Sequence, residues 1–345
     1  METSFGPVLV GDQALSEVDQ WWSQHEATVT SVHIVVDSNT LQSCAHPFLS
    51  SLPSFPEIQF LELEPGEESK SPEVLAQLWV ALAEQGADRN SLLIGLGGGI
   101  VTDVTGMLAA TFMRGIRHIL VPTSLLAMAD AAIGGKNGIN VMGVKNLAGT
   151  FKSAELTAVW PGFLNTLPED EWRQGLAESL KHAILHGGAL WESAQHWERR
   201  GRVMDDLEAI IAVKISVVAS DAKEQGARKQ LNLGHTMAHA IESVTGGQIA
   251  HGDAVAAGMW MEAGIARERG LLTEQECMSI QDIIDRFFKR VTWDGNLWTW
   301  MQLDKKREAD NVYMSLPTGI GQGAPAVVVE SQEVNQVIET YALRT

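Results

Sequence analysis

The stretch SLLIGLGGGIVTDVTG, residues 91–106, decides the fold class. Its first half is an apolar run that ends in three glycines, and a helical pattern follows at once. A short continuous apolar run bounded by a turn signal is typical of a buried strand in a parallel sheet. The stretch therefore predicts a strand, a tight turn and a helix, the repeating unit of an α/β domain.

The same alternation extends on both sides of this stretch. Apolar runs that end at turn residues predict further strands, and helical periodicity between Pro72 and Gly86 predicts a helix. The predicted strands are residues 32–38, 57–64 and 117–125. Residues 1–166 are thus expected to form a Rossmann-like α/β domain with a mostly parallel sheet. From about Leu167 the pattern is helical, with 205–225 as one expected helix, so residues 167–345 are expected to form a mainly α-helical domain.

The composition excludes several classes of protein. With 25 basic and 43 acidic residues the net charge is −18, which argues against nucleic acid or an anionic membrane as the main partner. No apolar run is long enough for a membrane helix, and the N-terminus lacks the pattern of a secretory signal. Cys44 and Cys277 are the only cysteines and form no CxxC pair, so neither a disulfide framework nor a thiolate zinc site is expected. A reducing, cytoplasmic location is the expectation.

Two glycine-rich segments are candidates for anion binding. Gly97, Gly98 and Gly99 open a predicted helix, where free N–H groups could hold a phosphate, and Asp103 follows one turn later. Thr102 replaces the third glycine of a dinucleotide fingerprint, so an ordinary tight turn explains the motif equally well. Residues 129–151 combine glycine turns with several lysines and little apolar content, and in so acidic a chain this favours anion binding over a solvated basic loop.

Histidines and one carboxylate are the candidates for metal binding. His235 and His239 lie four apart on a predicted helix, a familiar zinc spacing that also arises by chance, and His251 begins the next predicted helix. Spacing alone favours His235 and His239 as the ligand pair with a carboxylate as third ligand. Glu178 and Lys181 lie three apart on one helix face, where a surface ion pair is the ordinary interpretation.

Taken together, these stretches resemble the dehydroquinate synthase family from about Asp37 to Lys306. The matching strings occur in one order, which makes the set far more specific than any one of them. They are GGGIVTDVTG, ATFMRG, VPTSLLAMADAAIGGKNGIN, KNLAGTF, TLPEDEWRQGLAESLKH, VKISVVASDAKEQGARKQLNLGHTMAHAIE and HGDAVAAGM.

The resemblance implies an NAD⁺-binding α/β domain, a helical metal-binding domain and an active site between them. It implies zinc, with cobalt as an alternative, held by Glu178, His235 and His251, and it assigns His239 to the substrate instead. Arg114 matches an arginine that reaches the substrate phosphate across a dimer interface in the family, so a homodimer is implied.

The remaining assignments are also implied by the resemblance alone. The expected cofactor contacts are Asp37, Asn39, Glu67, Lys70, Gly98, Gly99, Asp103, Thr123, Ser124, Lys145 and Thr166. The expected substrate contacts, besides Arg114, are Asp130, Lys136, Asn146, Lys181, Lys214, Arg228, Asn232, His239 and one or both of Lys305 and Lys306. The chain departs from the family pattern at Asp221-Ala222, at residues 152–154 and at Trp160, positions that bear on packing and cofactor fit more than on reaction type.

The family reaction turns the seven-carbon keto-acid phosphate DAHP into the carbocycle 3-dehydroquinate and phosphate, as a carbon–oxygen lyase of the shikimate pathway. Two rival enzyme classes share parts of the pattern. Sister cyclases act on sedoheptulose 7-phosphate or glucose 6-phosphate, which lack a carboxylate, whereas Lys214, Arg228 and Asn232 favour a keto-acid substrate here. A metal-dependent polyol dehydrogenase would accumulate NADH, and a non-catalytic NAD-binding protein would not need a full set of metal ligands.

Overall fold

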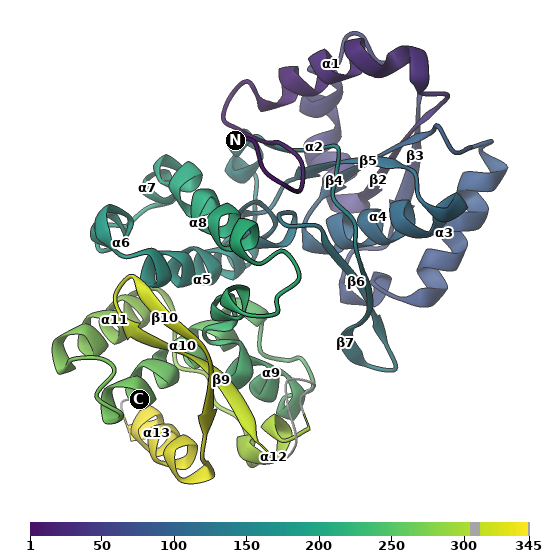
Figure 1. Ribbon diagram of the computed structural model, residues 1–345. Helices are drawn as coiled ribbons and strands as arrows, with labels where there is room; N and C mark the ends of the chain where they lie inside the picture. Colours follow the sequence, from purple (N-terminus) through teal and green to yellow (C-terminus); the bar gives the residue numbers. More distant parts are fainter. Residues whose placement is uncertain (304–310, 344–345) are drawn as a thin grey trace. The chain divides into compact units, whose positions relative to one another are not determined.

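The computed structural model describes residues 1–303 and 311–343 and divides into an N-terminal unit, Met1–Trp172, and a C-terminal unit, Arg173–Thr345. The boundary predicted from sequence lies between Thr166 and Leu167. The N-terminal unit is an α/β domain and the C-terminal unit is mainly helical, which confirms the expected fold class (Figure 1).

The N-terminal unit is built on a six-stranded parallel sheet in the order β1-β8-β5-β4-β2-β3. All four strands expected from the apolar runs are present. The strands are β1 (Val8–Val10), β2 (Val32–Asp37), β3 (Ile58–Leu63), β4 (Leu92–Gly97), β5 (Arg117–Pro122) and β8 (Leu156–Val159). The helices are α1 (Ala14–His25), α2 (Ser38–Ser50), α3 (Pro72–Glu84) and α4 (Gly99–Thr111), with the short turns η1 (Glu26–Thr28), η2 (Glu67–Ser69), η3 (Phe112–Arg114), η4 (Ala127–Ala131) and η5 (Pro161–Asn165).

Strand β4 is central to this unit, and every one of its residues is buried. A Cβ on Gly97 would lie 2.5 Å from Val101 Cβ, so this glycine is what lets α4 pack directly onto the end of the strand. Leu93 of β4 lies in the core cluster with residues of α3 and α4. The glycine turn therefore lies between the buried strand β4 and the helix α4, which packs against the end of that strand.

Residues 129–151 depart from the expected loop. They contain the end of the π-helical turn η4 and an antiparallel hairpin of β6 (Lys136–Val141) and β7 (Val144–Phe151) (Figure 1). Ile139 belongs to the core cluster under α4, so the segment has a packing role that its few apolar residues did not reveal. The hairpin side chains of β7 are mostly exposed.

The C-terminal unit consists of nine described helices, the turn η6 and a hairpin. Its helices are α5 (Glu169–His186, which begins in the N-terminal unit), α6 (Gly188–Ala194), α7 (Arg200–Asp205), α8 (Leu207–Ser220), α9 (His235–Val244), α10 (His251–Glu268), α11 (Glu274–Phe287), α12 (Leu297–Met301) and α13 (Ser331–Leu343), and η6 spans Ala227–Asn232. The strands β9 (Val312–Gly319) and β10 (Gln322–Val329) were not expected from the sequence.

Helix α10 is the core of this unit. All residues from Gly252 to Ala266 except Asp253 are buried, because α9, α11, α13 and β9 surround the helix. No helix among the described residues is long and apolar enough to cross a membrane.

One predicted helix is too long. Helix α8 ends at Ser220, whereas the pattern predicted helix up to residue 225. The Asp221 carboxylate accepts hydrogen bonds from the backbone N–H groups of Gln225, Gly226 and Arg228 at 2.9, 2.7 and 3.1 Å. Such local side-chain bonds compete with helix propagation, and here they form the turn that leads into η6.

Candidate functional site

Three potential metal ligands meet in the C-terminal unit. Glu178 lies on α5 and is buried, while His235 and His251 are the first residues of α9 and α10. The Nε2 atoms of His235 and His251 each lie 3.4 Å from Glu178 Oε1. One ligand atom from each residue lies within 4.8 Å of the others, and this is a donor set that suits zinc.

Both histidines are oriented by a second hydrogen bond. His235 Nδ1 lies 3.1 Å from the Leu233 carbonyl oxygen, and His251 Nδ1 lies 3.1 Å from Glu242 Oε1. When Nδ1 donates to an oxygen, the Nε2 lone pair is left for a metal, and this arrangement recurs around protein-bound zinc. Glu242 was not predicted, because a glutamate on an amphipathic helix is read as surface charge.

Contacts between α5 and α10 hold His251 beside Glu178. The Gln174 side-chain oxygen accepts from the Gly252 backbone N–H, and Arg173 Nη2 lies 3.2 Å from Asp253 Oδ2. A Cβ on Gly252 would lie 2.6 Å from Gln174 Cα, so the two helices meet at backbone distance. Spacing along the chain could not reveal this proximity, since α5 and α10 are far apart in sequence.

A second close approach positions His235. Gly234 precedes α9 with φ +83, and its N–H donates to the buried carboxylate of Glu262 on α10. A Cβ on Gly258 of α10 would lie 2.0 Å from the Gly234 carbonyl oxygen. The start of α9 therefore rests directly on α10, and this contact sets the place of His235.

The charges around the cluster are strongly coupled. Burial raises the pKa of Glu178, but Lys181, whose Nζ pairs with Oε2, and His235 hold it well below the usual range. Burial lowers the pKa of His235 to about 4. Burial also lowers the pKa of His251, but hydrogen bonds and charges from Glu178 and Glu242 outweigh this effect and raise it to about 9.

The other expected substrate residues of this unit lie on neighbouring elements. The His239 ring centre is 5.9 Å from that of His235, one turn along α9, but His239 is not in the three-residue cluster. Arg228 is buried in η6, where Nη1 donates to the Ala222 carbonyl at 2.8 Å. Lys214 of α8 is buried, and Asn232 Nδ2 lies 3.0 Å from Glu224 Oε1. Lys305 and Lys306 lie outside the described residues.

In the N-terminal unit, expected cofactor residues gather at one edge of the sheet. Asp37 ends β2, Gly98 and Gly99 follow β4, and Thr123 and Ser124 follow β5. In an open parallel sheet, ligands bind outside the carboxyl ends of the strands, where the strand order reverses direction. That reversal lies between β2 and β4 here, because β3 flanks β2 on one side while β4 and β5 continue on the other.

The turn after β3 brings two further expected residues, Glu67 and Lys70, to this edge. Lys70 Nζ lies 2.5 Å from Asp103 Oδ2 on α4, in an ion pair with both side chains largely buried. Burial raises the pKa of Asp103, and the charge of Lys70 opposes that rise. Gly98 and Gly99 begin α4 without side chains, which leaves backbone N–H groups open for an anion such as a pyrophosphate. These residues fit NAD⁺.

The remaining expected residues of this unit are spread over several elements. Asp130 lies in the π-helical turn η4. Lys136 begins β6, and Lys145 and Asn146 are exposed on β7. Arg114 is exposed at the end of η3 with φ +70. Asn39 and Thr166 are exposed, Asn39 in the first turn of α2 and Thr166 after η5.

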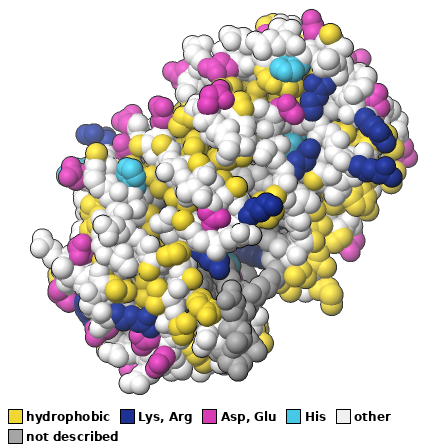
Figure 2. Space-filling view, viewed as in Figure 1, with side chains coloured by type: hydrophobic (Ala, Val, Ile, Leu, Met, Phe, Trp, Pro, Cys, Tyr) yellow, Lys and Arg dark blue, Asp and Glu magenta, His cyan; other side chains and the backbone are white. Residues whose placement is uncertain are grey.

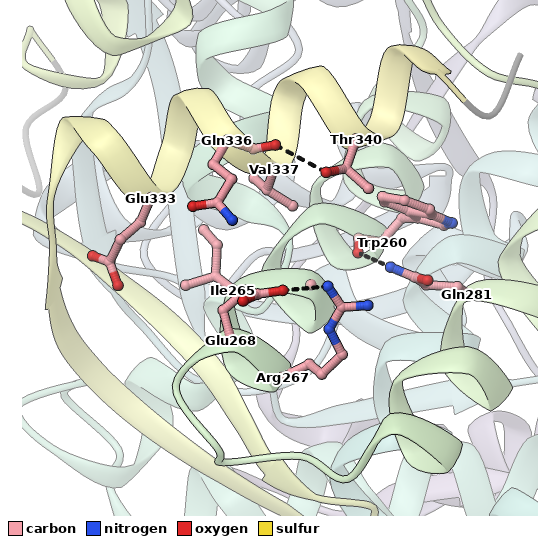
Figure 3. A pocket seen from close by; sticks show the side chains of 10 residues that line it. Trp260, Ile265, Arg267, Glu268, Gln281, Glu333, Gln336, Val337 and Thr340 are labelled. Atoms are coloured by element: carbon pink, nitrogen blue, oxygen red, sulfur yellow. Dashed lines mark hydrogen bonds and ion pairs between the residues drawn. The ribbon is translucent and has the colours of Figure 1, made fainter.

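A cavity elsewhere in the C-terminal unit contains none of the expected residues. It is lined by Trp260, Ile265 and Arg267 of α10, Gln281 of α11 and residues of α13 (Figure 3). Its volume of about 40 Å³ has room for one or a few water molecules. It is too small for a sugar phosphate, so the metal cluster remains the candidate site of this unit.

Comparison with known proteins agrees with this geometry. Models of the 3-dehydroquinate synthase N-terminal and C-terminal regions match residues 60–174 and 175–307. A 3-dehydroquinate synthase from Parabacteroides distasonis is 35% identical over 319 residues, which cover 89% of this chain and 90% of that protein. The chain belongs to the 3-dehydroquinate synthase family. This confirms the family predicted from the sequence and the reaction class, a carbon–oxygen lyase acting on phosphates.

Solved structures show that other cyclases share the dehydroquinate synthase fold of this chain. A 2-deoxy-scyllo-inosose synthase complexed with carbaglucose-6-phosphate, NAD⁺ and Co²⁺ superposes with a TM-score of 0.88 at 24% identity, over 99% of both chains. A 2-epi-5-epi-valiolone synthase from Streptomyces hygroscopicus subsp. jinggangensis, with NAD⁺ and Zn²⁺ bound, gives 0.84 at 25% identity over 100% of this chain and 99% of that one.

Proposed function

We propose that this chain converts DAHP into 3-dehydroquinate and phosphate, with a zinc ion held by Glu178, His235 and His251 and NAD⁺ held at the carboxyl edge of the N-terminal sheet. The observation that carries the proposal is the cluster of three ligand atoms within 4.8 Å of one another. Two imidazoles and one carboxylate leave a coordination position open, as in catalytic zinc sites. Cobalt is the alternative metal, since one cyclase relative was solved with Co²⁺ and another with Zn²⁺.

The bound groups supply the redox and Lewis-acid chemistry. When bound, NAD⁺ takes up and later returns a hydride, and zinc polarises the substrate oxygen at the oxidised carbon. The residues of the chain have the tasks of binding, orienting and moving protons. Lys181 neutralises the buried carboxylate of Glu178, which keeps the ligand ionised and ready for a cation.

The substrate has two anionic groups, and separate residues are proposed for each. Lys136, Asn146, His239 and Arg114 bind the phosphate, whose own oxygen accepts the proton that is lost during elimination. Lys214 and Arg228 bind the carboxylate, Arg228 through its bidentate fork. Arg228 is buried and its guanidinium is already anchored on the Ala222 carbonyl, so little side-chain entropy is lost on binding. Asp130, Lys181, Asn232 and one or both of Lys305 and Lys306 complete the proposed substrate contacts.

The test is an assay of purified, zinc-loaded protein with NAD⁺ and DAHP that follows both phosphate release and NADH absorbance. Phosphate release without net NADH absorbance is the expected result, because the cofactor is regenerated within each turnover. NADH accumulation would point to a polyol dehydrogenase, and turnover of sedoheptulose 7-phosphate or glucose 6-phosphate in place of DAHP would point to a sister cyclase. An Arg228→Ala variant with full DAHP turnover would remove the argument for a carboxylate site.

We infer that the functional form is a homodimer in which Arg114 contributes to the partner's phosphate site. Met113 and Arg114 both have left-handed backbone, at φ +47 and +70, a strained conformation typical of functional segments. Hydrophobic side chains are exposed on the β6–β7 hairpin, with Met142 93% and Phe151 59% exposed (Figure 2). Exposed apolar surface of this kind marks an interaction site. Light scattering should give twice the chain mass of 37.5 kDa, and the mass of one chain would contradict the inference.

Metal affinity is expected to rise with pH. The pKa of His251 is raised to about 9, so the metal-free protein holds a proton there at pH 7 that a metal must displace. Affinity should rise roughly tenfold per pH unit from pH 7 towards 9, while His235, with a pKa of about 4, contributes nothing in this range. In the metal-free protein the same proton stabilises the fold fully below pH 6.5, and this stability is lost as the pH rises through about 9.

The measurement is zinc affinity by chelator competition at several pH values between 7 and 9. A matched variant is Glu242→Gln, which keeps a hydrogen-bond acceptor for His251 Nδ1 but removes the charge, so the pH dependence should move to lower pH. A flat affinity profile in the parent protein would contradict the prediction.

A further inference from the structure

Asn140, a residue without an assigned role, connects two parts of the proposed cofactor and substrate site. Its backbone N–H donates to the Lys70 carbonyl at 2.7 Å, and its side-chain Nδ2 donates to Glu67 Oε1 at 2.7 Å. Its Oδ1 accepts from the Asn146 backbone N–H at 2.9 Å. Asn140 thus joins the turn after β3 to the hairpin strand β7 by three hydrogen bonds.

The two partners determine how the Asn140 amide must be oriented. Glu67 presents a carboxylate, which only accepts, and Asn146 presents a backbone N–H, which only donates. An amide satisfies both at once, with Nδ2 towards Glu67 and Oδ1 towards Asn146. A carboxylate at position 140 would still accept from Asn146 but would face Glu67 as a like charge.

The contact with Asn146 falls at a defect in the hairpin. The β6–β7 ladder is interrupted opposite Asn140, where residues 145–147 of β7 form a bulge and Asn146 has φ +52. A bulge leaves backbone groups without ladder partners and turns side chains to new directions. Asn146 is at the centre of the bulge, and the ladder does not pair its backbone N–H. The Asn140 side chain accepts from this N–H instead.

We propose that Asn140 is a positioning residue that fixes the Lys145–Asn146 bulge against the Glu67–Lys70 turn. The proposal rests on the proposed function, in which Glu67, Lys70 and Lys145 contact NAD⁺ and Asn146 contacts the substrate phosphate. Lys70 is itself tied to Asp103 by a buried ion pair, so the bulge is linked through Asn140 to helix α4. One side chain then determines whether the cofactor and phosphate contacts are arranged before ligands arrive.

The first experiment measures NAD⁺ dissociation constants and DAHP kinetics for Asn140→Ala in the zinc-loaded full chain. Loss of a hydrogen bond to a charged group corresponds to about 10- to 100-fold in affinity. We expect the NAD⁺ dissociation constant and the KM for DAHP each to rise at least about tenfold, with zinc content unchanged. The control Asn335→Ala makes the same substitution at an exposed position of α13, where the Asn335 side chain donates to Ser331 Oγ at 3.3 Å, and should match the parent.

The second experiment exchanges donor and acceptor. Asn140→Asp should weaken NAD⁺ binding at least as much as Asn140→Ala, because the new carboxylate faces Glu67. Combining it with Glu67→Gln places an amide donor opposite the carboxylate and restores both hydrogen bonds. Because Glu67 is itself a proposed NAD⁺ contact, Glu67→Gln alone is measured too, and the loss of NAD⁺ affinity in the double variant should be about tenfold smaller than the two single losses combined. A residue with only a general role in stability would not produce this coupling.

Two outcomes would overturn the proposal: NAD⁺ affinity and KM of Asn140→Ala within twofold of the parent, or a double variant whose loss of affinity equals the two single losses combined. The NAD⁺ titrations do not require turnover. If the parent protein bound NAD⁺ but released no phosphate from DAHP, the proposed function would fail while the role of Asn140 in cofactor binding would still be decided.

Discussion

Replacing His251 by alanine is expected to empty the metal site, whereas His239→Ala is expected to leave the metal in place. Glu178, His235 and His251 bring their ligand atoms within 4.8 Å of one another, and His239 is outside that cluster. Loss of a group that only orients a ligand costs about 10- to 100-fold in metal affinity, so loss of a ligand should cost more than about 100-fold.

Turnover should fall in both variants but for different reasons. His251→Ala removes the Lewis acid, and the loss of about 4 kcal/mol of transition-state stabilisation corresponds to about a thousandfold in kcat/KM. His239→Ala should mainly raise KM, since its proposed partner is the substrate phosphate. Zinc content, measured by atomic emission, distinguishes the two variants. If His239→Ala lost its zinc while His251→Ala kept it, the ligand pair would instead be His235 and His239, as spacing alone favours.

Gly258→Ala should destabilise the C-terminal unit and disturb the metal site together. The new Cβ would lie 2.0 Å from the Gly234 carbonyl oxygen, a backbone atom that cannot rotate away. The helices must then separate at the point where α9 begins with His235. Overpacking of this kind costs about 3 kcal/mol, which corresponds to a fall of roughly 6 to 12 °C in Tm for a unit of this size. Zinc affinity should fall as well.

The matched control is Gly264→Ala on the same helix. Its new Cβ would lie 2.7 Å from Val337 Cγ2, the end of a side chain that can rotate, so the loss in Tm should be smaller and zinc affinity should not change. Scanning calorimetry and zinc titration of both variants make the comparison. Equal losses of zinc affinity in the two would show that the Gly234–Gly258 contact has no special part in placing His235.

Four of the six strands in the N-terminal sheet were predicted because each is an apolar run that ends at turn residues, as in LLIGLG before Gly98 and RHILVP before Thr123. Strands β1 and β8, with three and four residues, were not predicted because so short a run gives little pattern. The β6–β7 hairpin was not, since its glycines and lysines resemble a loop and its one core residue, Ile139, is isolated. The β9–β10 hairpin was missed after a long series of helices. Local periodicity reports buried faces, and β7 has hardly any, because its side chains are mostly exposed.

The metal cluster was predictable only in part. His235 lies in a helix-spaced pair with His239, and this pattern cannot tell which histidine faces a distant carboxylate. His251 comes beside Glu178 through the packing of α5 on α10 by Gln174 and Gly252. Glu242, which orients His251, has the sequence context of a solvated glutamate. Tertiary packing determines which residues meet in the cluster. The sequence therefore indicated His251 only through the family resemblance and not through spacing.

The order of strands in the sheet has a consequence for how the chain folds. Strand β1 has three residues and pairs with β8, with Val8 opposite Thr157. During synthesis residues 8–10 must wait until most of the N-terminal unit has emerged, so the edge of the sheet closes late and over a long loop. Between its own synthesis and its pairing with β1, the fully buried strand β8 is an open edge on which another nascent chain can pair. Once β1 has paired, the edge strand on this side of the finished sheet is only three residues long, which gives another chain little to pair with.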